Sequence, residues 1–114
     1  MLKDGNKILR GQVYWIALDP AVGTEVNKTR PAVVVSNDIH NHSSPRVVVM
    51  PVTSNVQKVY HFEVVINIVG NSSKAMADQI RVVDKSRIGK FITTLTEDEM
   101  ESIDIAIKTV LALK

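Results

Sequence analysis

The sequence predicts a mainly β fold of the α+β kind, a small barrel accompanied by one C-terminal α-helix. The chain has 114 residues, which suits one domain with one hydrophobic core. Its apolar residues fall in short, valine-rich segments separated by turn-forming residues, which is typical of a small barrel or a partly open sheet. The last segment instead has helical periodicity. We expect a single domain over residues 1–114, with residues 1–9 as a flexible tail.

Five segments rich in β-branched and aromatic residues are expected to form strands. They are Gln12–Leu18, Ala32–Ser36, Arg46–Thr53, His61–Ile68 and Met76–Val83. Breaks are expected between them, where Pro, Gly, Asn, Asp and Ser favour turns. These breaks are Asp19-Pro20, Asn37-Asp38, Ser44-Pro45 and residues 70–73.

Two of the expected strands are apolar at consecutive positions, Ala32–Val35 and Val47–Val52. Alternation is expected when only one face is buried, so this pattern predicts cover on both faces. Pro51 has no amide hydrogen to donate to a neighbouring strand. It therefore indicates an edge or a bulge just before Thr53.

The C-terminal segment is expected to be a helix that starts after Thr96. Thr96 and Glu99 form a capping box, in which each side chain accepts a hydrogen bond from the other residue's backbone amide. An apolar face follows, made of Met100, Ile103, Ile107, Val110 and Leu111. Ile105 and Leu113 lie off this face and indicate either a second contact or a wide core-facing stripe.

Composition excludes several classes of protein and of site. The chain has no cysteine, which rules out disulfides, thiolate catalysis and cysteine-based zinc sites. No apolar run approaches the roughly 20 residues that a membrane span needs, and the N-terminus lacks a secretion signal, so we expect a cytoplasmic protein. His40 and His42 lack a third ligand at a metal-binding spacing, and no P-loop or dinucleotide fingerprint is present. We expect neither a metal nor a cofactor.

Charge is unevenly divided along the chain. Residues 96–114 hold five acidic and two basic residues, whereas residues 1–95 hold seven acidic and twelve basic ones, so the body is +5 and the tail −3. A basic body is compatible with a polyanionic partner such as nucleic acid. Ordinary solvating charge on a barrel surface explains the same count, and both interpretations stay open.

The connection from Asp19 to Pro31 is long for a small barrel, and loops of this kind are often functional. Arg30 lies just before a proline and should be extended. Its guanidinium is well placed either to bind a phosphate or to pair with an acid such as Glu25. Thr53 and Ser54 end a strand and could offer hydroxyls, although such residues are common there.

The sequence resembles the MazF/PemK family of mRNA interferase toxins over nearly its whole length, from about Arg10 to Leu113. The resemblance rests on several segments in the same order: residues 10–15, Asp19-Pro20, Gly23-Thr24-Glu25, residues 29–37, residues 51–54 and residues 78–88. The Gly-x-Glu…Arg-Pro pattern with the later Thr-Ser is the specific part. Glu25 is followed by Val26-Asn27-Lys28, which departs from common members, so no cleavage sequence is transferred.

This resemblance implies an SH3-like, CcdB-like barrel that forms a homodimer and binds single-stranded RNA in a groove across the dimer. It implies metal-independent cleavage that leaves 2′,3′-cyclic phosphate and 5′-hydroxyl ends. Arg30 and Thr53 match the principal catalytic pair, and Glu25 matches an acidic loop position. Contacts to RNA are expected from Thr24, Lys28, Asn37, Ser54 and Gln79. A MazE-like antitoxin is the implied protein partner, with operator DNA reached only through it.

In such a reaction the 2′-hydroxyl attacks the adjacent phosphorus, so the protein must align these atoms and stabilise the charge that develops. Arg30 and Thr53 suit that electrostatic task, while the groups that transfer protons stay unassigned. Two alternatives remain. One is a non-catalytic toxin like the gyrase-poisoning CcdB proteins, which has no need of this pair. The other is a basic RNA-binding module.

Overall fold

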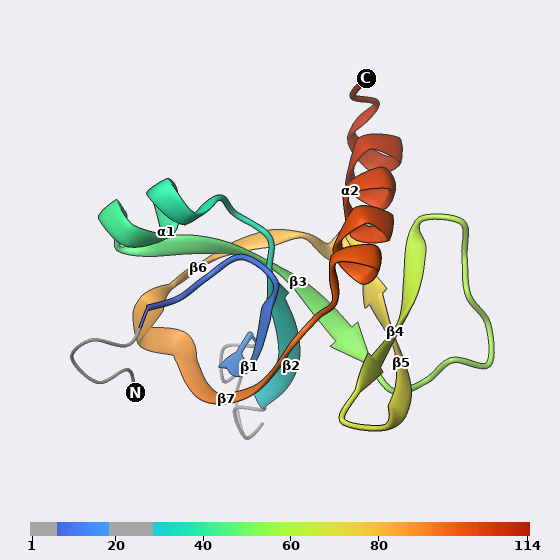
Figure 1. The fold of residues 1–114 in the computed structure, drawn as a ribbon, viewed down its shortest axis with the longest axis horizontal. Helices are drawn as coiled ribbons and strands as arrows, with labels where there is room; N and C mark the ends of the chain where they lie inside the picture. The colour runs from blue at the N-terminus through green and yellow to red at the C-terminus, as the bar shows by residue number, and fades with distance from the viewer. Residues whose placement is uncertain (1–6, 19–28) are drawn as a thin grey trace, which may run out of the picture.

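A computed structural model describes residues 7–18 and 29–114 of the chain. These residues form seven β-strands, two α-helices and two 3-10 turns (Figure 1). In chain order the elements are β1 Gln12–Ala17, β2 Thr29–Val34, α1 Asp38–Ser43, β3 Arg46–Thr53, β4 Glu63–Ile68, β5 Asn71–Met76, η1 Ala77–Gln79, β6 Arg81–Asp84, η2 Lys85–Arg87, β7 Ile88–Thr94 and α2 Glu97–Leu111.

The strands form one strongly curled sheet in the order β4-β5-β3-β2-β1-β7, with β6 also paired to β3. All the pairings are antiparallel. The predicted mainly β barrel-like fold with a C-terminal helix is confirmed, the barrel being a curled half-barrel.

Strand β3 changes partners at Pro51. On one side it pairs with β6 from Arg46 to Val49 and then with β5 at Val52 and Thr53. On its other side it pairs with β2, with Ala32 opposite Pro51. Pro51 thus lies between the end of the pairing with β6 and the start of the pairing with β5. On that side of β3 its missing amide hydrogen interrupts neither pairing, so the strand tolerates a proline there.

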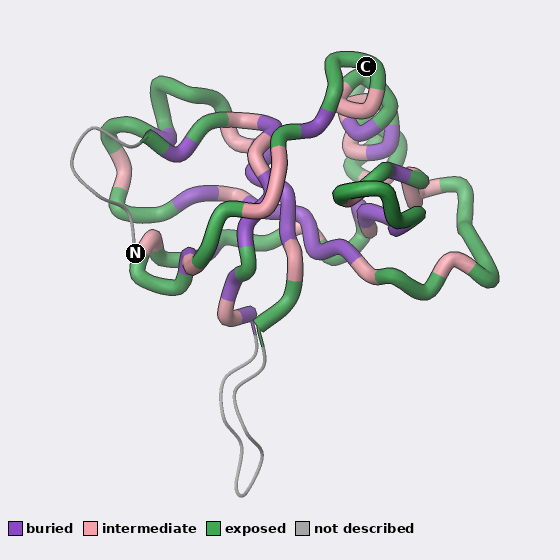
Figure 2. Tube along the Cα trace, turned by 60° about the horizontal axis from the view of Figure 1, so that its bottom comes forward, coloured by how far each residue is buried: buried purple, intermediate pink, exposed green. Residues whose placement is uncertain are grey.

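The strands β2 and β3 are covered on both faces, as their unbroken apolar runs predict. Successive residues alternate between two hydrophobic cores: Val33 and Val35 lie in core 1, whereas Ala32 and Val34 lie in core 2. Core 1 includes residues of α2, β4 and β5, and core 2 fills the curl formed mainly by β1, β2, β3 and β6. Figure 2 shows the resulting buried stretches at the centre of the molecule.

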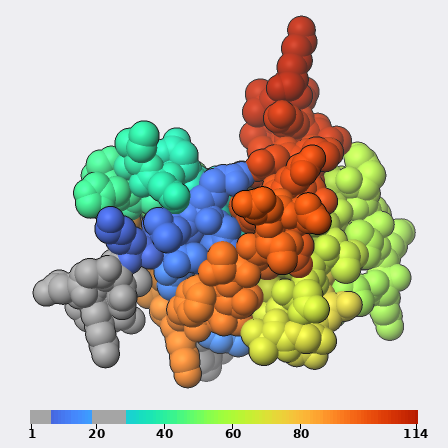
Figure 3. All heavy atoms as spheres, in the orientation of Figure 1, coloured from blue at the N-terminus to red at the C-terminus, as the bar shows by residue number. Residues whose placement is uncertain are grey.

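The C-terminal helix begins as predicted. The Thr96 hydroxyl accepts from the Glu99 amide at 3.1 Å, and the Glu99 carboxylate accepts from the Thr96 amide at 2.9 Å. Ile103 and the smaller Ala106 are its buried residues. Leu111, expected on the core-facing side, is half exposed, because the end of α2 projects beyond the sheet (Figures 1 and 3).

An ion pair fastens the middle of α2 to the start of the sheet. Arg10 bonds Asp104 through its guanidinium, and its Nε donates to the Val35 carbonyl at 3.1 Å. Ile8 is also in place: it is 5% exposed and packs in core 2. Ile8, which belongs to the segment 1–9 expected to be a flexible tail, therefore packs against the sheet.

A short helix, α1, carries His40 and His42 between the breaks expected at Asn37-Asp38 and Ser44-Pro45. Asn37 caps α1 by accepting from the His40 amide at 2.8 Å. Asn41 is buried, and it donates to the Ser36 carbonyl at 2.8 Å while also bonding the Ser36 hydroxyl. A buried asparagine with these partners fixes the helix against β2, and no sequence periodicity reveals it.

The second half of the sheet differs from the prediction. Residues 71–73, expected to be a break, begin β5, and the turn lies at Val69 and Gly70, both with positive φ. The expected strand Met76–Val83 is interrupted by η1, which turns the chain from β5 into β6. Strand β7 was not predicted. In β5 the polar residues Ser73 and Lys74 are buried, so the hydrophobic pattern is absent where the strand lies.

Glu99 should contribute a pH-dependent part of the stability. Burial by itself raises the pKa of Glu99, but bonds from the Thr96 amide, the Asn67 amide at 2.8 Å and the Thr96 hydroxyl outweigh it and leave the pKa below its ordinary value of 4.5. Its contribution is thus present above pH 4.5 and lost as pH falls through the lowered pKa. We expect Glu99→Gln to cost about 1–2 kcal/mol at pH 7 in urea unfolding.

This cost should shrink when the same comparison is made at about pH 3. Glu101→Gln, at an exposed position two residues along the same helix, is the matched control and should stay near the parent at both pH values. An equal loss of stability in the two variants would contradict the assigned role of Glu99.

The backbone of β1 passes too close to Gly89 to leave room for a side chain at that position. The pairing of β1 with β7 is irregular between Tyr14 and Ile16, and a Cβ atom built on Gly89 would lie 2.9 Å from the Trp15 carbonyl oxygen. Since that neighbour is backbone in a sheet, it cannot move aside cheaply. We expect Gly89→Ala to lower the free energy of unfolding by about 1–3 kcal/mol, measured by urea denaturation. Lys90→Ala at the adjacent exposed position should change it by less than about 0.5 kcal/mol.

Candidate active site

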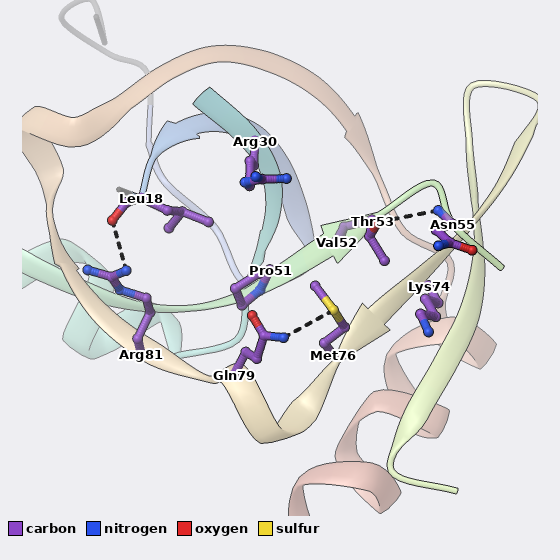
Figure 4. A pocket seen from close by; sticks show the side chains of 10 residues that line it. All are labelled: Leu18, Arg30, Pro51, Val52, Thr53, Asn55, Lys74, Met76, Gln79 and Arg81. Carbon is purple, nitrogen blue, oxygen red and sulfur yellow. Dashed lines mark hydrogen bonds between the residues drawn. The ribbon is translucent and has the colours of Figure 1, made fainter. Parts of the chain in front are cut away.

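A pocket of about 530 Å³ opens beside the first residues of β2 and the last residues of β3 (Figure 4). It lies on the sheet face that carries core 2, just beyond that core. It is bounded by residues from β2, β3, β5, η1 and β6, by Leu18 just after β1 and by Asn55 just after β3. The described residues that line it are Leu18, Arg30, Pro51, Val52, Thr53, Asn55, Lys74, Met76, Gln79 and Arg81.

The register of the sheet brings Arg30 and Thr53 together. Ala32 lies opposite Pro51 in the antiparallel pair of β2 and β3. Two residues further along, the same register sets Arg30 opposite Thr53, with both side chains on the face that carries core 2. The close-up in Figure 4 shows both at the pocket. Arg30 lies in a strand, as its position before Pro31 predicts.

Thr53 is oriented by a turn that starts the β3–β4 loop (residues 54–62). Its Oγ1 accepts from the Asn55 amide at 3.3 Å, and the Asn55 Oδ1 accepts from the Gln57 amide at 3.2 Å. These bonds hold the chain as it leaves β3. Accepting a hydrogen bond uses a lone pair of the Thr53 hydroxyl, so its O–H can still donate to a ligand.

Gln79 reaches the pocket because η1 interrupts the expected strand. The corner Ala77–Gln79 joins two strands that both pair with β3, so it must lie beside Pro51. The Gln79 side chain donates to the Met76 sulfur at 3.4 Å, and both residues line the pocket (Figure 4).

The lining is positively charged. Arg30 and Arg81 contribute to this charge, whereas the third basic residue of the lining, Lys74, is paired with the Glu63 carboxylate. Arg81 is oriented by donating to the Leu18 carbonyl at 2.8 Å, and Arg87 donates to the Ala17 carbonyl at 3.0 Å. A concave site with this lining attracts anions, phosphate esters among them.

Lys74 is a pocket residue that the sequence analysis did not single out. It lies opposite Thr53 in the pair of β3 and β5, and its ammonium lies 2.9 Å from the Glu63 carboxylate. The side chains are 10% and 6% exposed. Burial by itself raises the pKa of Glu63, but the Tyr60 amide and Lys74 outweigh it and hold the pKa below its ordinary value. The signal that was missed is a lone lysine inside β5.

The other expected site residues are placed differently. Asn37 caps α1, and Ser54 is exposed just beyond β3; neither is among the residues that line the pocket. Thr24, Glu25 and Lys28 lie outside the described residues. The structure thus brings together Arg30, Thr53 and Gln79 from the expected set, and adds Lys74, Arg81 and Asn55.

The adjacent aromatic residues Tyr14 and Trp15 point to opposite faces of β1, as expected for a strand. Tyr14 is 3% exposed and Trp15 is 42% exposed. The histidines do not gather: His40 and His42 are exposed on α1, and His61 packs edge-on against Phe62. In residues 7–18 and 29–114, no cluster of three or more His, Asp or Glu side chains could hold a metal ion. No helix within these ranges has the length and apolar character to cross a membrane.

Comparison with known proteins agrees with this fold. Residues 9–111 match the family described as PemK-like, MazF-like toxin of type II toxin-antitoxin system. Endoribonuclease MazF9 of Mycobacterium tuberculosis is 40% identical, over 87% of this chain and 92% of that protein. Endoribonuclease EndoA of Bacillus subtilis is 37% identical, over 93% of this chain and 96% of that protein.

A solved structure, an endoribonuclease in complex with its cognate antitoxin from a Mycobacterial species, is similar with a TM-score of 0.76 at 27% identity. The similarity covers 96% of this chain and 97% of that one. The expected family is thereby confirmed over nearly the whole chain. The chain belongs to the family of PemK-like, MazF-like toxins of type II toxin–antitoxin systems.

Proposed function

We propose that this chain is a toxin of a toxin–antitoxin pair that cleaves single-stranded RNA by attack of the 2′-hydroxyl, leaving 2′,3′-cyclic phosphate and 5′-hydroxyl ends. The observation that carries the proposal is the meeting of Arg30 and Thr53 in a positively charged pocket. Their relative position follows from the register of β2 and β3, two strands that are covered on both faces.

The chemistry needs no nucleophile from the protein. The attacking 2′-oxygen and the leaving 5′-oxygen must lie in line across the phosphorus, and charge grows on the phosphoryl oxygens as the bonds change. The Arg30 guanidinium can donate two parallel hydrogen bonds to these oxygens, and the Thr53 hydroxyl can donate one. Donors held in place before the reaction stabilise the transition state without the cost of reorganisation.

Substrate contacts are assigned to Gln79 and Ser54, with Thr24, Lys28 and Asn37 as further candidates from the sequence. Gln79 has the strongest support because it lines the same pocket as Arg30. Glu25 is the candidate general base, since arginine remains protonated and is poorly suited to proton transfer. We propose that neither a metal nor a cofactor takes part.

The alternative of a CcdB-like toxin that binds a protein target such as gyrase is less well supported. The two relatives described above, at 40% and 37% identity, are both named endoribonucleases. A protein-binding toxin also has no use for Arg30 and Thr53 at the base of a cationic pocket.

The proposed partners follow from the same surface. The solved relative is bound to its cognate antitoxin, and we propose a MazE-like antitoxin as the partner of this chain. This chain would contact operator DNA only through that antitoxin. An acidic antitoxin segment would be drawn to the pocket by the field that attracts RNA. We also propose that the active form is a cytoplasmic homodimer with the RNA groove shared across it.

Removing either pocket donor should abolish most of the cleavage of a long single-stranded RNA in buffer containing EDTA. We expect Thr53→Val, which keeps the side-chain shape, to lower the single-turnover rate about 10²- to 10³-fold, and Arg30→Ala to lower it at least as much. Gel mapping of the products should find 5′-hydroxyl and cyclic-phosphate ends with the parent chain.

The matched control is Arg46→Ala, which removes an exposed arginine at the opposite end of β3 from Thr53 and should leave the rate within about twofold. RNA that stays intact with the parent chain would falsify the proposal. Toxicity on expression without any RNA cleavage would favour the protein-binding alternative instead.

A further inference from the structure

The pocket contains a buried ion pair that the proposed chemistry does not use. Lys74 lies directly across from Thr53 and is 8% exposed. Its ammonium donates to the Glu63 carboxylate at 2.9 Å and to the Lys58 carbonyl at 2.6 Å. Lysine is rarely buried this fully unless it is paired, because its charge is costly to remove from water.

The pair does not serve to attract phosphate. Its two charges neutralise each other, and in Figure 4 the Lys74 side chain is directed away from Arg30. The ion pair is also not needed to hold β4 against β5, because apolar side chains of the same size would stabilise that contact as well or better. Its bonds instead point to the β3–β4 loop, defined above as residues 54–62.

Both members of the pair bond to that loop. Lys74 bonds the Lys58 carbonyl, and the same oxygen of Glu63 that contacts Lys74 accepts from the Tyr60 amide at 2.9 Å. One ammonium and one carboxylate oxygen therefore fix the backbone of residues 58–60. The β3–β4 loop is thus held near its start by the bonds of Thr53 and Asn55, and near its end by Lys74 and Glu63.

The part held in this way carries an exposed aromatic ring beside a cation. Tyr60 is 45% exposed and stacks on Phe62, with ring centroids 5.5 Å apart and planes 3° apart. The Lys58 ammonium lies 4.9 Å from the centre of the Tyr60 ring, and the Lys74 ammonium lies 5.9 Å from it. A ring that can stack a base, next to a lysine that can contact a phosphate, is the combination that binds single-stranded nucleic acid.

We propose that Lys74 and Glu63 are positioning residues that fix Tyr60 as a stacking surface for a nucleotide beside the one that is cleaved. This inference rests on the proposed RNA cleavage and adds to it. It assigns part of the RNA affinity to the β3–β4 loop, whereas Arg30 and Thr53 carry the reaction.

The test uses the full-length protein and an RNA oligonucleotide containing a cleavage site mapped in the long RNA. A second version has a 2′-deoxy sugar at the attacking nucleotide and cannot be cut, so it reports binding alone. The fluorescent base 2-aminopurine replaces each nucleotide near the site in turn, because stacking on an aromatic ring quenches its emission.

With the parent chain, we expect quenching at one position next to the cleaved bond. Tyr60→Ala and Lys74→Met should each abolish that quenching and raise Kd about tenfold. The single-turnover rate at saturating RNA should stay within about twofold of the parent. The double variant should bind no worse than either single one, because both changes remove the same contact.

Matched variants separate this role from a loss of structure. Tyr60→Phe keeps the ring and Lys74→Arg keeps the cation, so both should retain the quenching. Lys90→Met, at an exposed lysine on β7, should leave Kd within about twofold. Since Lys74→Met leaves Glu63 buried without its cation, the variant Glu63→Gln/Lys74→Met, with no net change of charge, is measured beside it and carries the same expectation.

Two results would overturn the inference: parent-like Kd and quenching in Tyr60→Ala, or a fall in the saturating rate of the Lys74 variants as large as their loss of affinity. The failure of the proposed function is a different observation, namely that the parent chain leaves RNA intact.

Discussion

The structure depends on one constraint, the sharing of β3 between two parts of the sheet. Because β3 is apolar on both faces, it can separate two cores, one under α2 and one inside the curl. At Pro51 its neighbour changes from β6 to β5, and the corner η1 has to lie at that point. The pocket lies beside this change of partner, on the sheet face that carries core 2 and just beyond that core. The proposed active site therefore results from the way the sheet curls.

Much of this fold could be predicted where local chemistry and tertiary packing agree. The limits of β3 and the capping box of α2 match the prediction because valine runs and a Thr-Glu pair act over a few residues. β5 was not predicted because its buried Ser73 and Lys74 are polar, and the partners of Lys74, Glu63 and the Lys58 carbonyl, lie in other parts of the chain. Likewise, α1 depends on Asn41 bonding back to Ser36, a contact that no periodic pattern encodes.

The site divides in the same way. Arg30 and Thr53 were found because the family resemblance marks them, and the register of β2 and β3 supplies the physical reason for their proximity. Lys74 and Arg81 could not be singled out from the sequence, because each is one basic residue among fourteen until the strands are paired. Asn37 shows the opposite case. It matches a substrate-contacting position, yet its side chain is already engaged in capping α1.

The basic residues of the pocket differ in role: two arginines attract anions, whereas the lysine is paired with a carboxylate. Arg30 and Arg81 are two permanent positive charges in the pocket lining, which attracts anions. The charge of Lys74 is cancelled at 2.9 Å by Glu63, so its influence is short-ranged and confined to the loop that it bonds. Attraction of the polyanion and placement of its bases are thus assigned to separate groups. A chain built in this way can change how tightly it holds RNA through residues 54–62 while Arg30 and Thr53, and with them the mode of cleavage, stay the same.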